Sequence, residues 1–213
     1  MGVSTSYQLP KHFAAFTSWP SPKVSSAIKA YEAGEYDFGI DHTVIMTLTG
    51  LNLEESKVLV KAFSRNQSGV VNAMVFFSAV LMLAEPNRRV TLYQPGAIFD
   101  LYDFDKTGQL SMDEFTIMLS CVGLSCALIL SRVDECLDDE SNTEFAKGIY
   151  AKLGKVNGAP ISKSEVLGVV KEYFDDHDVK TVDQFFGRLV LGKDCLEWKD
   201  PDADSSVASK KEN

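Results

Sequence analysis

The stretch DFDKTGQLSMDE, from Asp103 to Glu114, places oxygen-bearing residues at alternate positions around a single glycine. With Asp103 as position 1, these residues fall at positions 1, 3, 5, 7, 9 and 12. Gly108 stands at position 6, where a sharp turn favours a residue that adopts positive φ at little cost. An accidental polar turn is the alternative, but it does not require this spacing together with the apolar Leu110 at position 8. We therefore interpret the stretch as a ligand loop for a cation.

Calcium is the cation that this spacing favours, because Ca²⁺ takes six to eight oxygens and a 12-residue loop can supply them from these positions. Positions 1 and 3 offer carboxylates, positions 5 and 9 hydroxyls, position 7 its backbone carbonyl and position 12 two oxygens. Mg²⁺ is the expected competitor, and three carboxylates predict an affinity of roughly 0.1 to 10 μM. The predicted metal ligands are Asp103, Asp105, Thr107, Gln109, Ser111 and Glu114.

Apolar residues at helical spacing flank this loop, which predicts one helix before it and one after it. They are Ile98, Phe99 and Tyr102 before the loop, and Phe115, Met118, Leu119 and Val122 after it. A ligand loop between two such helices resembles the EF-hand superfamily of calcium-binding proteins. The resemblance implies a second hand, because paired loops in that superfamily share a two-stranded contact and a joint core.

The stretch SRNQSGVVNAMV, residues 64–75, is the predicted partner of the ligand loop. It repeats the template, with Gly69 at position 6 and Val71 at position 8. Ser64 replaces the first acid and Val75 replaces the last, so no carboxylate offsets the dehydration of a divalent cation. We expect this hand to be structural. Its remaining candidate ligands are the neutral Asn66, Ser68 and Asn72.

A third, degenerate hand is predicted at GKVNGAPISKSE, residues 154–165. Ile161 stands at position 8 and Glu165 at position 12, but Gly154 and Val156 occupy the two leading acid positions. One carboxylate does not hold calcium at useful affinity, so we expect no ion there.

The acidic cluster from Asp175 to Asp178 permits a fourth site or a solvated turn. It lacks a glycine and follows the third hand too closely, which favours a turn before a helix that begins at Thr181.

The rest of the chain is patterned for helices, so the predicted fold class is all-α, with helix–loop–helix pairs in two lobes and short strands between loops. The helical patterns cover residues 55–63, 73–83, 113–122, 143–153, 164–174 and 182–191, with weaker ones at 11–19 and 25–33. The predicted organisation is an N-terminal helical lead at 1–50, a pair of hands at 51–123, a linker at 124–142, a degenerate lobe at 143–192 and a disordered tail at 193–213.

Within the EF-hand superfamily, the long lead, the neutral first hand and the run IFDLYDFDKTGQLSMDEF resemble the neuronal-calcium-sensor and calcineurin-B group. Axonemal relatives of calaxin and of the outer-dynein-arm docking subunit share this layout. The resemblance implies a helical sensor or light-chain-like subunit that grips an amphipathic helix of a partner protein, and a cilium or flagellum as one location. This chain departs from the group by keeping ligands in only one loop, which argues against strong cooperativity.

Composition excludes several classes of partner. Acidic residues outnumber basic ones by 30 to 21, for a net charge of -9, and no basic cluster could follow a nucleic-acid backbone. No apolar run was expected to approach the roughly 20 residues of a membrane span, so we predict a cytoplasmic protein. MGVSTS at the N-terminus fits N-myristoylation of Gly2, which alone would give marginal membrane binding.

The four cysteines show neither CxxC spacing nor the density of a disulfide scaffold. Cys121 and Cys126 are read as buried small hydrophobic residues, with a redox role as the alternative.

Three functional readings compete. The first is a calcium sensor subunit whose hand opens to expose apolar residues, with Met74 and Met82 near the groove or simply in the core. The second is a constitutive structural light chain of a ciliary or dynein assembly. The third, an enzyme, is disfavoured because His12, His42 and His177 are scattered and no nucleophile or phosphate-loop motif is present.

Overall fold

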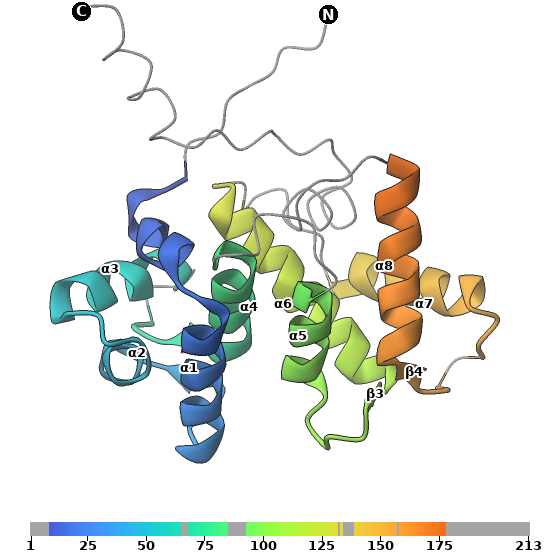
Figure 1. Ribbon diagram of the computed structural model, residues 1–213, viewed down its shortest axis with the longest axis horizontal. Helices are drawn as coiled ribbons and strands as arrows, with labels where there is room; N and C mark the ends of the chain where they lie inside the picture. The colour runs from blue at the N-terminus through green and yellow to red at the C-terminus, as the bar shows by residue number, and fades with distance from the viewer. Residues whose placement is uncertain are drawn as a thin grey trace, which may run out of the picture.

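Helices dominate the fold of this protein in the computed structural model, which describes residues 9–64, 68–84, 93–131, 133, 139–156 and 158–177 (Figure 1). The first half contains η1 (Lys11–Ser18), α1 (Ser21–Ala33), β1 (Gly39–Ile40), α2 (His42–Thr49), α3 (Leu53–Phe63), β2 (Val71–Asn72) and α4 (Ala73–Leu83). The second half contains α5 (Tyr93–Tyr102), β3 (Gln109–Leu110), α6 (Met112–Ile129), α7 (Asp139–Lys152), β4 (Ile161–Ser162) and α8 (Lys163–His177).

Each of two antiparallel strand pairs joins two helix–loop–helix units, one pair in each half of the chain. In the first half, β1 pairs with β2, and Ile40 lies opposite Val71. In the second half, β3 pairs with β4, and Leu110 lies opposite Ile161. All four apolar strand residues are buried, so each strand pair ties its two loops to the core. The all-α class with short strands between loops is therefore confirmed.

The strand pairs correct the predicted pairing of loops. Residues 64–75 were expected to pair with 103–114, but they pair with a segment of the supposed N-terminal lead. The loop at 103–114 instead pairs with the loop at 154–165. A helix–strand–helix unit formed by α1, β1 and α2 was missed, so residues 1–50 are not merely a lead.

Two further boundaries differ from the predictions. The linker was expected to begin at residue 124, but α6 continues to Ile129 because its last two turns are buried. The acidic cluster was expected to form a turn, but Asp175 and Asp176 lie inside α8. Gly2, Asn66, the helix at 182–191 and the tail at 193–213 lie outside the described residues.

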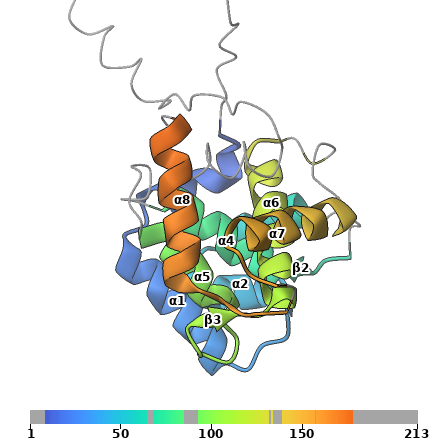
Figure 2. The same ribbon diagram turned by 90° about the vertical axis from the view of Figure 1, so that its right-hand side faces the viewer.

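The two halves meet through α4 and α6, which lie against each other at the centre of the molecule (Figures 1 and 2). The buried Ser125 hydroxyl of α6 donates to the Val75 carbonyl of α4 at 2.7 Å. On the same side, the Tyr102 hydroxyl of α5 lies 2.9 Å from the Ser78 hydroxyl of α4. One continuous hydrophobic core thus runs through both halves.

The segment η1 is part of that core. Phe13 and Phe16 are fully buried, and Phe13 packs edge-on against Phe63 with ring centroids 5.4 Å apart. Phe16 packs in the same way against Phe76 at 5.8 Å. The aromatic side chains of η1 therefore fill the apolar face between α3 and α4.

Among the described residues, α6 alone is long and apolar enough to cross a membrane, with a mean hydropathy of 1.6. This corrects the expectation that no run approaches that length. Length and composition are weak grounds, since core helices pass the same test, and 56% of α6 is buried inside this fold. Its packing against α4 accounts for its apolar composition.

Candidate metal centre

The loop at 103–114 connects α5 to α6 and is closed by hydrogen bonds to its own acidic side chains. The Asp103 carboxylate is buried and accepts hydrogen bonds from the N–H groups of Thr107, at 2.9 Å, and Gly108, at 2.8 Å. Asp105 also accepts from the Thr107 N–H, at 3.2 Å. Gly108 has a φ of 76°, the left-handed conformation expected at position 6.

The side chains at positions 1, 3 and 5 therefore share one hydrogen-bonded turn. Hydrogen bonds from the Thr107 side chain and backbone lower the pKa of the Asp105 carboxyl, which favours the charged form that a cation needs. The Thr107 hydroxyl donates to the carbonyl of Gln109 at 3.2 Å, so the carbonyl predicted as the ligand at position 7 belongs to the same turn.

Glu114 is held apart from these residues by a helix cap. Its carboxylate accepts hydrogen bonds from both the N–H and the hydroxyl of Ser111, each at 2.9 Å. The Glu114 N–H in turn donates to the Ser111 hydroxyl, which completes a capping box at the start of α6. Accordingly, no three His, Cys, Asp or Glu side chains within the described residues form a group that could share a metal ion.

The capping box keeps Glu114 bonded to Ser111 rather than to the other predicted ligands. Glu114 would have to release Ser111 and turn toward Asp103 and Asp105. Breaking a capping box costs about 0.5–2 kcal/mol, which is modest beside the attraction between a divalent cation and three carboxylates. The donor set and the loop conformation therefore fit calcium, provided that the capping box opens.

Two contacts connect this loop to the first half of the chain. The Lys106 ammonium, at position 4, lies 2.8 Å from the Glu32 carboxylate of α1. The exposed Phe104 ring, at position 2, meets Phe38 from the loop before β1, with ring centroids 5.8 Å apart. A change in the conformation of this loop would therefore alter its contacts with α1 and with the segment before β1.

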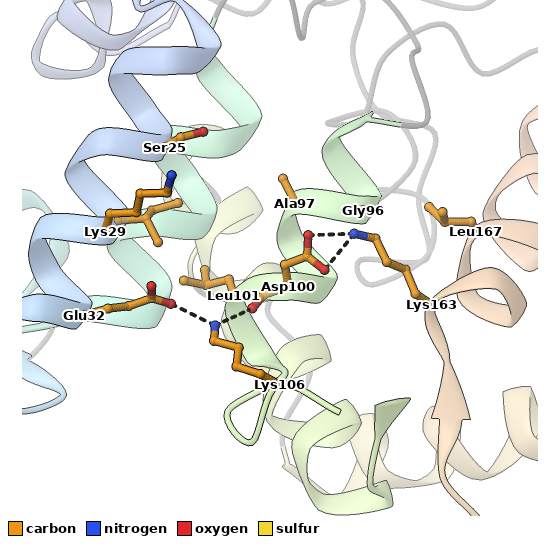
Figure 3. Close-up of a pocket in the computed structure, with 11 residues that line it drawn as sticks. Ser25, Lys29, Glu32, Gly96, Ala97, Asp100, Leu101, Lys106, Lys163 and Leu167 are labelled. Atoms are coloured by element: carbon orange, nitrogen blue, oxygen red, sulfur yellow. Dashed lines mark hydrogen bonds and ion pairs between the residues drawn. The ribbon is translucent and has the colours of Figure 1, made fainter. Parts of the chain in front are cut away.

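A cavity of about 450 Å³ lies between α1, α5 and α8 beside the loop (Figure 3). Lys106 closes it on the α1 side, and Lys163 from the start of α8 closes it on the other side by an ion pair of 2.6 Å to Asp100. The ion pair between Lys163 and Asp100 thus ties α8 to α5 beside this cavity. Lys106 connects α1 to α5 there, because its ammonium pairs with Glu32 and donates to the Asp100 carbonyl at 3.4 Å.

The loop at 64–75 lacks acidic ligands, as its sequence indicates. Its position-1 and position-5 hydroxyls, on Ser64 and Ser68, lie 3.2 Å apart and bond to each other. Asn72 caps α4 by accepting from the N–H groups of Met74 and Val75. The described part of this loop therefore has a left-handed glycine, a buried strand residue and a helix cap, without the charge that a cation requires.

Sequence reasoning missed the unit around β1 because its loop lacks the usual markers. If Ile40 takes position 8, as its pairing with Val71 indicates, then Phe38 replaces the glycine at position 6 and Val44 replaces the glutamate at position 12.

The sequence signal that could have identified this unit is an apolar residue followed directly by a helix-capping residue. The four pairs are Ile40–Asp41, Val71–Asn72, Leu110–Ser111 and Ile161–Ser162.

The burial predicted for Cys121 and Cys126 is confirmed, and the Cys126 sulfur lies 3.5 Å from the Met82 sulfur. The Cys126 side chain thus belongs to the contact between α4 and α6, whereas Cys121 interacts with the buried Tyr102 of α5.

No protein-family model matches this chain, and no curated protein sequence matches it significantly. The chemistry and geometry of the loops are therefore the basis for a functional proposal.

Proposed function

We propose that this protein is a calcium-responsive regulatory subunit of the EF-hand type, which binds one Ca²⁺ at residues 103–114 and grips an amphipathic helix of a partner protein. The observation that carries this proposal is the loop itself. Its first three side-chain ligand positions converge on one turn around Gly108, between two helices and beside a strand that pairs with a second loop. Such a turn needs only the Glu114 carboxylate to complete a calcium site.

Movement of Glu114 is the step that would link the ion to a response. Glu114 is in the first turn of α6, so a carboxylate drawn to the ion pulls the start of that helix toward the loop. The next residue, Phe115, is buried, and the centroid of its ring lies 6.0 Å from that of Tyr150 in α7. Rotation of α6 would therefore separate α6 from α7 and expose apolar surface for a partner helix.

The residues that such an opening would expose are all buried here. Phe115, Met118 and Leu119 of α6 are each at most 3% exposed. Met74 and Met82 of α4 are core residues in this state. The aromatic residues of η1 already fill the apolar face of the first half, so the second half is the better place for a partner helix.

One observation favours a second candidate, a constitutive structural light chain, for example of a ciliary or flagellar dynein assembly. The loop is closed by its own hydrogen bonds, and the Oε2 atom of Glu114 is bound to Ser111 as a helix cap. If the capping box persists at cellular calcium levels, the second half of the chain stays shut. The protein would then hold its partner through surfaces that do not depend on calcium.

Calorimetric titration with Ca²⁺, in the presence of Mg²⁺ and with a hydrophobic dye read in parallel, tests the proposal. We expect one site of roughly micromolar affinity that is coupled to dye binding. Glu114→Gln should weaken binding by about 100-fold or more, because it removes one of three ligand charges.

Glu55→Gln is the matched control. Glu55 makes the same capping box with Asn52 at the start of α3, far from any predicted ligand. Both variants lose the charge of a capping glutamate, but only Glu114→Gln should lose calcium affinity. Binding without a dye response would favour the structural light chain, and wild-type binding in Glu114→Gln would exclude the loop as the site.

A further inference from the structure

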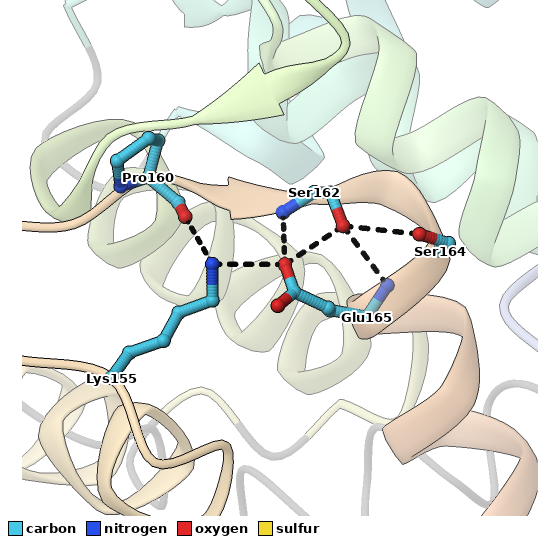
Figure 4. Close-up of polar contacts among 5 residues, drawn as sticks. All are labelled: Lys155, Pro160, Ser162, Ser164 and Glu165. Carbon is cyan, nitrogen blue, oxygen red and sulfur yellow. Dashed lines mark hydrogen bonds and ion pairs between the residues drawn. The ribbon is translucent and has the colours of Figure 1, made fainter.

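The loop at 154–165 holds a positive charge of its own, placed among its ligand positions (Figure 4). The Lys155 ammonium donates to the Pro160 carbonyl at 2.5 Å and lies 3.0 Å from the Glu165 carboxylate. With Gly154 as position 1, Pro160 is position 7 and Glu165 is position 12. These are the backbone-carbonyl position and the glutamate position of a 12-residue calcium loop. Lys155 therefore contacts two of the groups that a calcium ion would contact in such a loop.

The contacts around Glu165 show that its carboxylate is strongly hydrogen-bonded. The same Glu165 oxygen that faces Lys155 also accepts from the N–H and the hydroxyl of Ser162, both at 2.7 Å. These bonds and the ammonium lower the pKa of Glu165 to about 2. The Lys155 side chain is only 20% exposed, which is unusual for a lysine at a loop.

The backbone positions Lys155 for this role. Gly154 adopts a φ of 66° after α7, and the Lys155 N–H donates to the Tyr150 carbonyl at 2.9 Å. This end of α7 is a Schellman-like cap, which fixes the direction in which the lysine leaves the helix. The side chain then reaches back across the loop to Pro160, just before β4.

We propose that the Lys155 ammonium takes the place of the metal ion in the loop at 154–165 and holds this loop and strand β4 closed whether or not calcium is present. The loop is thus a hand with an internal cation. A divalent ion entering it would have to displace a covalently tethered charge, and only one carboxylate would remain to bind it.

This clamp also sets the ion response of the neighbouring loop, a step that rests on the proposed calcium site at 103–114. Strand β4 is the partner of β3, and the Lys163 N–H next to it donates to the Gly108 carbonyl at 3.3 Å. A permanently closed loop gives β3 a fixed partner before calcium arrives. Calcium binding then has to order only one loop instead of two, so less conformational entropy is lost on binding. The calcium affinity of the loop at 103–114 is therefore higher, and binding is non-cooperative.

The test compares Lys155→Met with Lys152→Met, first in a chelator that removes divalent ions. Lys152 lies one turn earlier and forms an exposed ion pair with Glu172, so it is a matched surface control. Amide hydrogen exchange of the β3–β4 pair should become about tenfold faster in Lys155→Met and stay within about twofold in Lys152→Met. Equal rates in Lys155→Met and the wild type, or an equal rise in both variants, would overturn the proposal.

Two further variants, Glu165→Gln and the double variant Lys155→Met/Glu165→Gln, keep the test decisive if Lys155→Met loosens the whole second half. If Lys155 and Glu165 act as one unit, the increase in exchange rate in the double variant should be smaller than the product of the increases in the two single variants. A multiplicative result would show independent effects and refute the clamp.

Calcium titration of the same variants then tests the link between the loops, where Lys155→Met should weaken binding about fivefold. Unchanged affinity would overturn that link. Absence of calcium binding in the wild type would instead overturn the proposed function and leave the exchange result standing.

Discussion

Glu114 and Glu165 occupy the same position in their loops and make the same capping contacts, yet their neighbours differ. Each carboxylate accepts from the N–H and hydroxyl of a serine three residues earlier. Glu165 also meets Lys155, which stands at position 2, whereas that position of the other loop holds the half-exposed Phe104. Glu114 has no ion pair within the described part of the chain. One carboxylate is thus matched by an internal charge, while the other is the one that an external ion would bind in the proposed function.

The low pKa of Glu165 predicts a specific dependence of stability on pH. Its folded pKa, about 2, lies below the ordinary value of 4.5, so the charged form stabilises the fold. This contribution is complete above the ordinary pKa and is lost as pH falls from 4.5 toward 2. At about pH 6 we expect the wild type to be more stable than Glu165→Gln, and we expect this difference in the free energy of unfolding to shrink as the pH is lowered to about 3. Urea titrations in the presence of a chelator measure the difference. A constant difference would contradict the assignment.

Gly108 and Gly148 predict opposite responses to the same substitution. A Cβ on either glycine would meet nothing within 4 Å, so only the backbone decides. Gly108 has a φ of 76°, and Gly108→Ala should destabilise the protein by about 1–2 kcal/mol. Gly148 is inside α7, and Gly148→Ala should stabilise it by about 0.5–1 kcal/mol. Urea unfolding of both variants without calcium measures the two signs, and two changes of the same sign would contradict the reasoning.

At the residue scale, the sequence predicted the left-handed conformation of Gly108 because the turn around it is formed by local contacts. The oxygen-bearing residues and Gly108 lie within 12 positions, and the turn that joins Asp103, Asp105 and Thr107 needs no distant contact. The Glu114 capping box was not predicted, although Ser111 followed by a glutamate three residues later is a recognised signal for one.

At the scale of elements, long amphipathic helices were readable and two-residue strands were not. The patterns at 55–63, 73–83 and 164–174 lie inside α3, α4 and α8. Strand pairing joins residues far apart in sequence, so no local pattern could indicate that β3 pairs with β4 instead of β2. The unit around β1 was hidden because Phe38 and Val44 replace its marker residues.

The 3₁₀ segment η1 is expected to be essential for the first half of the fold. Phe16 is fully buried and contacts the rings of Trp19 and Phe76. Phe16→Ala should lower the free energy of unfolding by about 3–5 kcal/mol, as truncation of a buried aromatic does. Thr17→Ala, at a half-exposed neighbour whose hydroxyl bonds only to Ala14, should cost less than about 1 kcal/mol. Similar unfolding midpoints for the two variants would show that η1 is a dispensable lead.

At the scale of the molecule, the loop at 103–114 is in contact with elements from both halves. Lys106 reaches Glu32 of α1, and Phe104 reaches Phe38 before β1. These contacts were invisible to the sequence because they join residues more than 60 positions apart. They provide a route by which an event in the loop at 103–114 could reach the first half of the chain.

Removal of the Lys106 partner should weaken this route without unfolding the protein. Both side chains of the pair are largely exposed, so Glu32→Gln should change stability by less than about 1 kcal/mol. In the wild type, calcium should slow amide exchange in α1, and this protection should be reduced in Glu32→Gln. Glu54→Gln breaks an exposed pair with Lys57 and should keep the protection. Protection that is equal in all three proteins would show that Lys106 does not transmit the change.

The placement of each helix cap directly after a strand residue has a consequence for engineering. Strand pairing uses position 8 and the helix cap uses position 9, whereas the predicted ligands at positions 1, 3 and 5 take part in neither. The two requirements overlap at positions 9 and 12, because Ser111 and Glu114 are both capping residues and predicted ligands. Ligands at positions 1, 3 and 5 can therefore be removed or added with little effect on how the units assemble, whereas a change at position 12 also changes the helix cap. The loop at 64–75, with its glycine, strand residue and cap already in place, is a natural host for a designed second ion site.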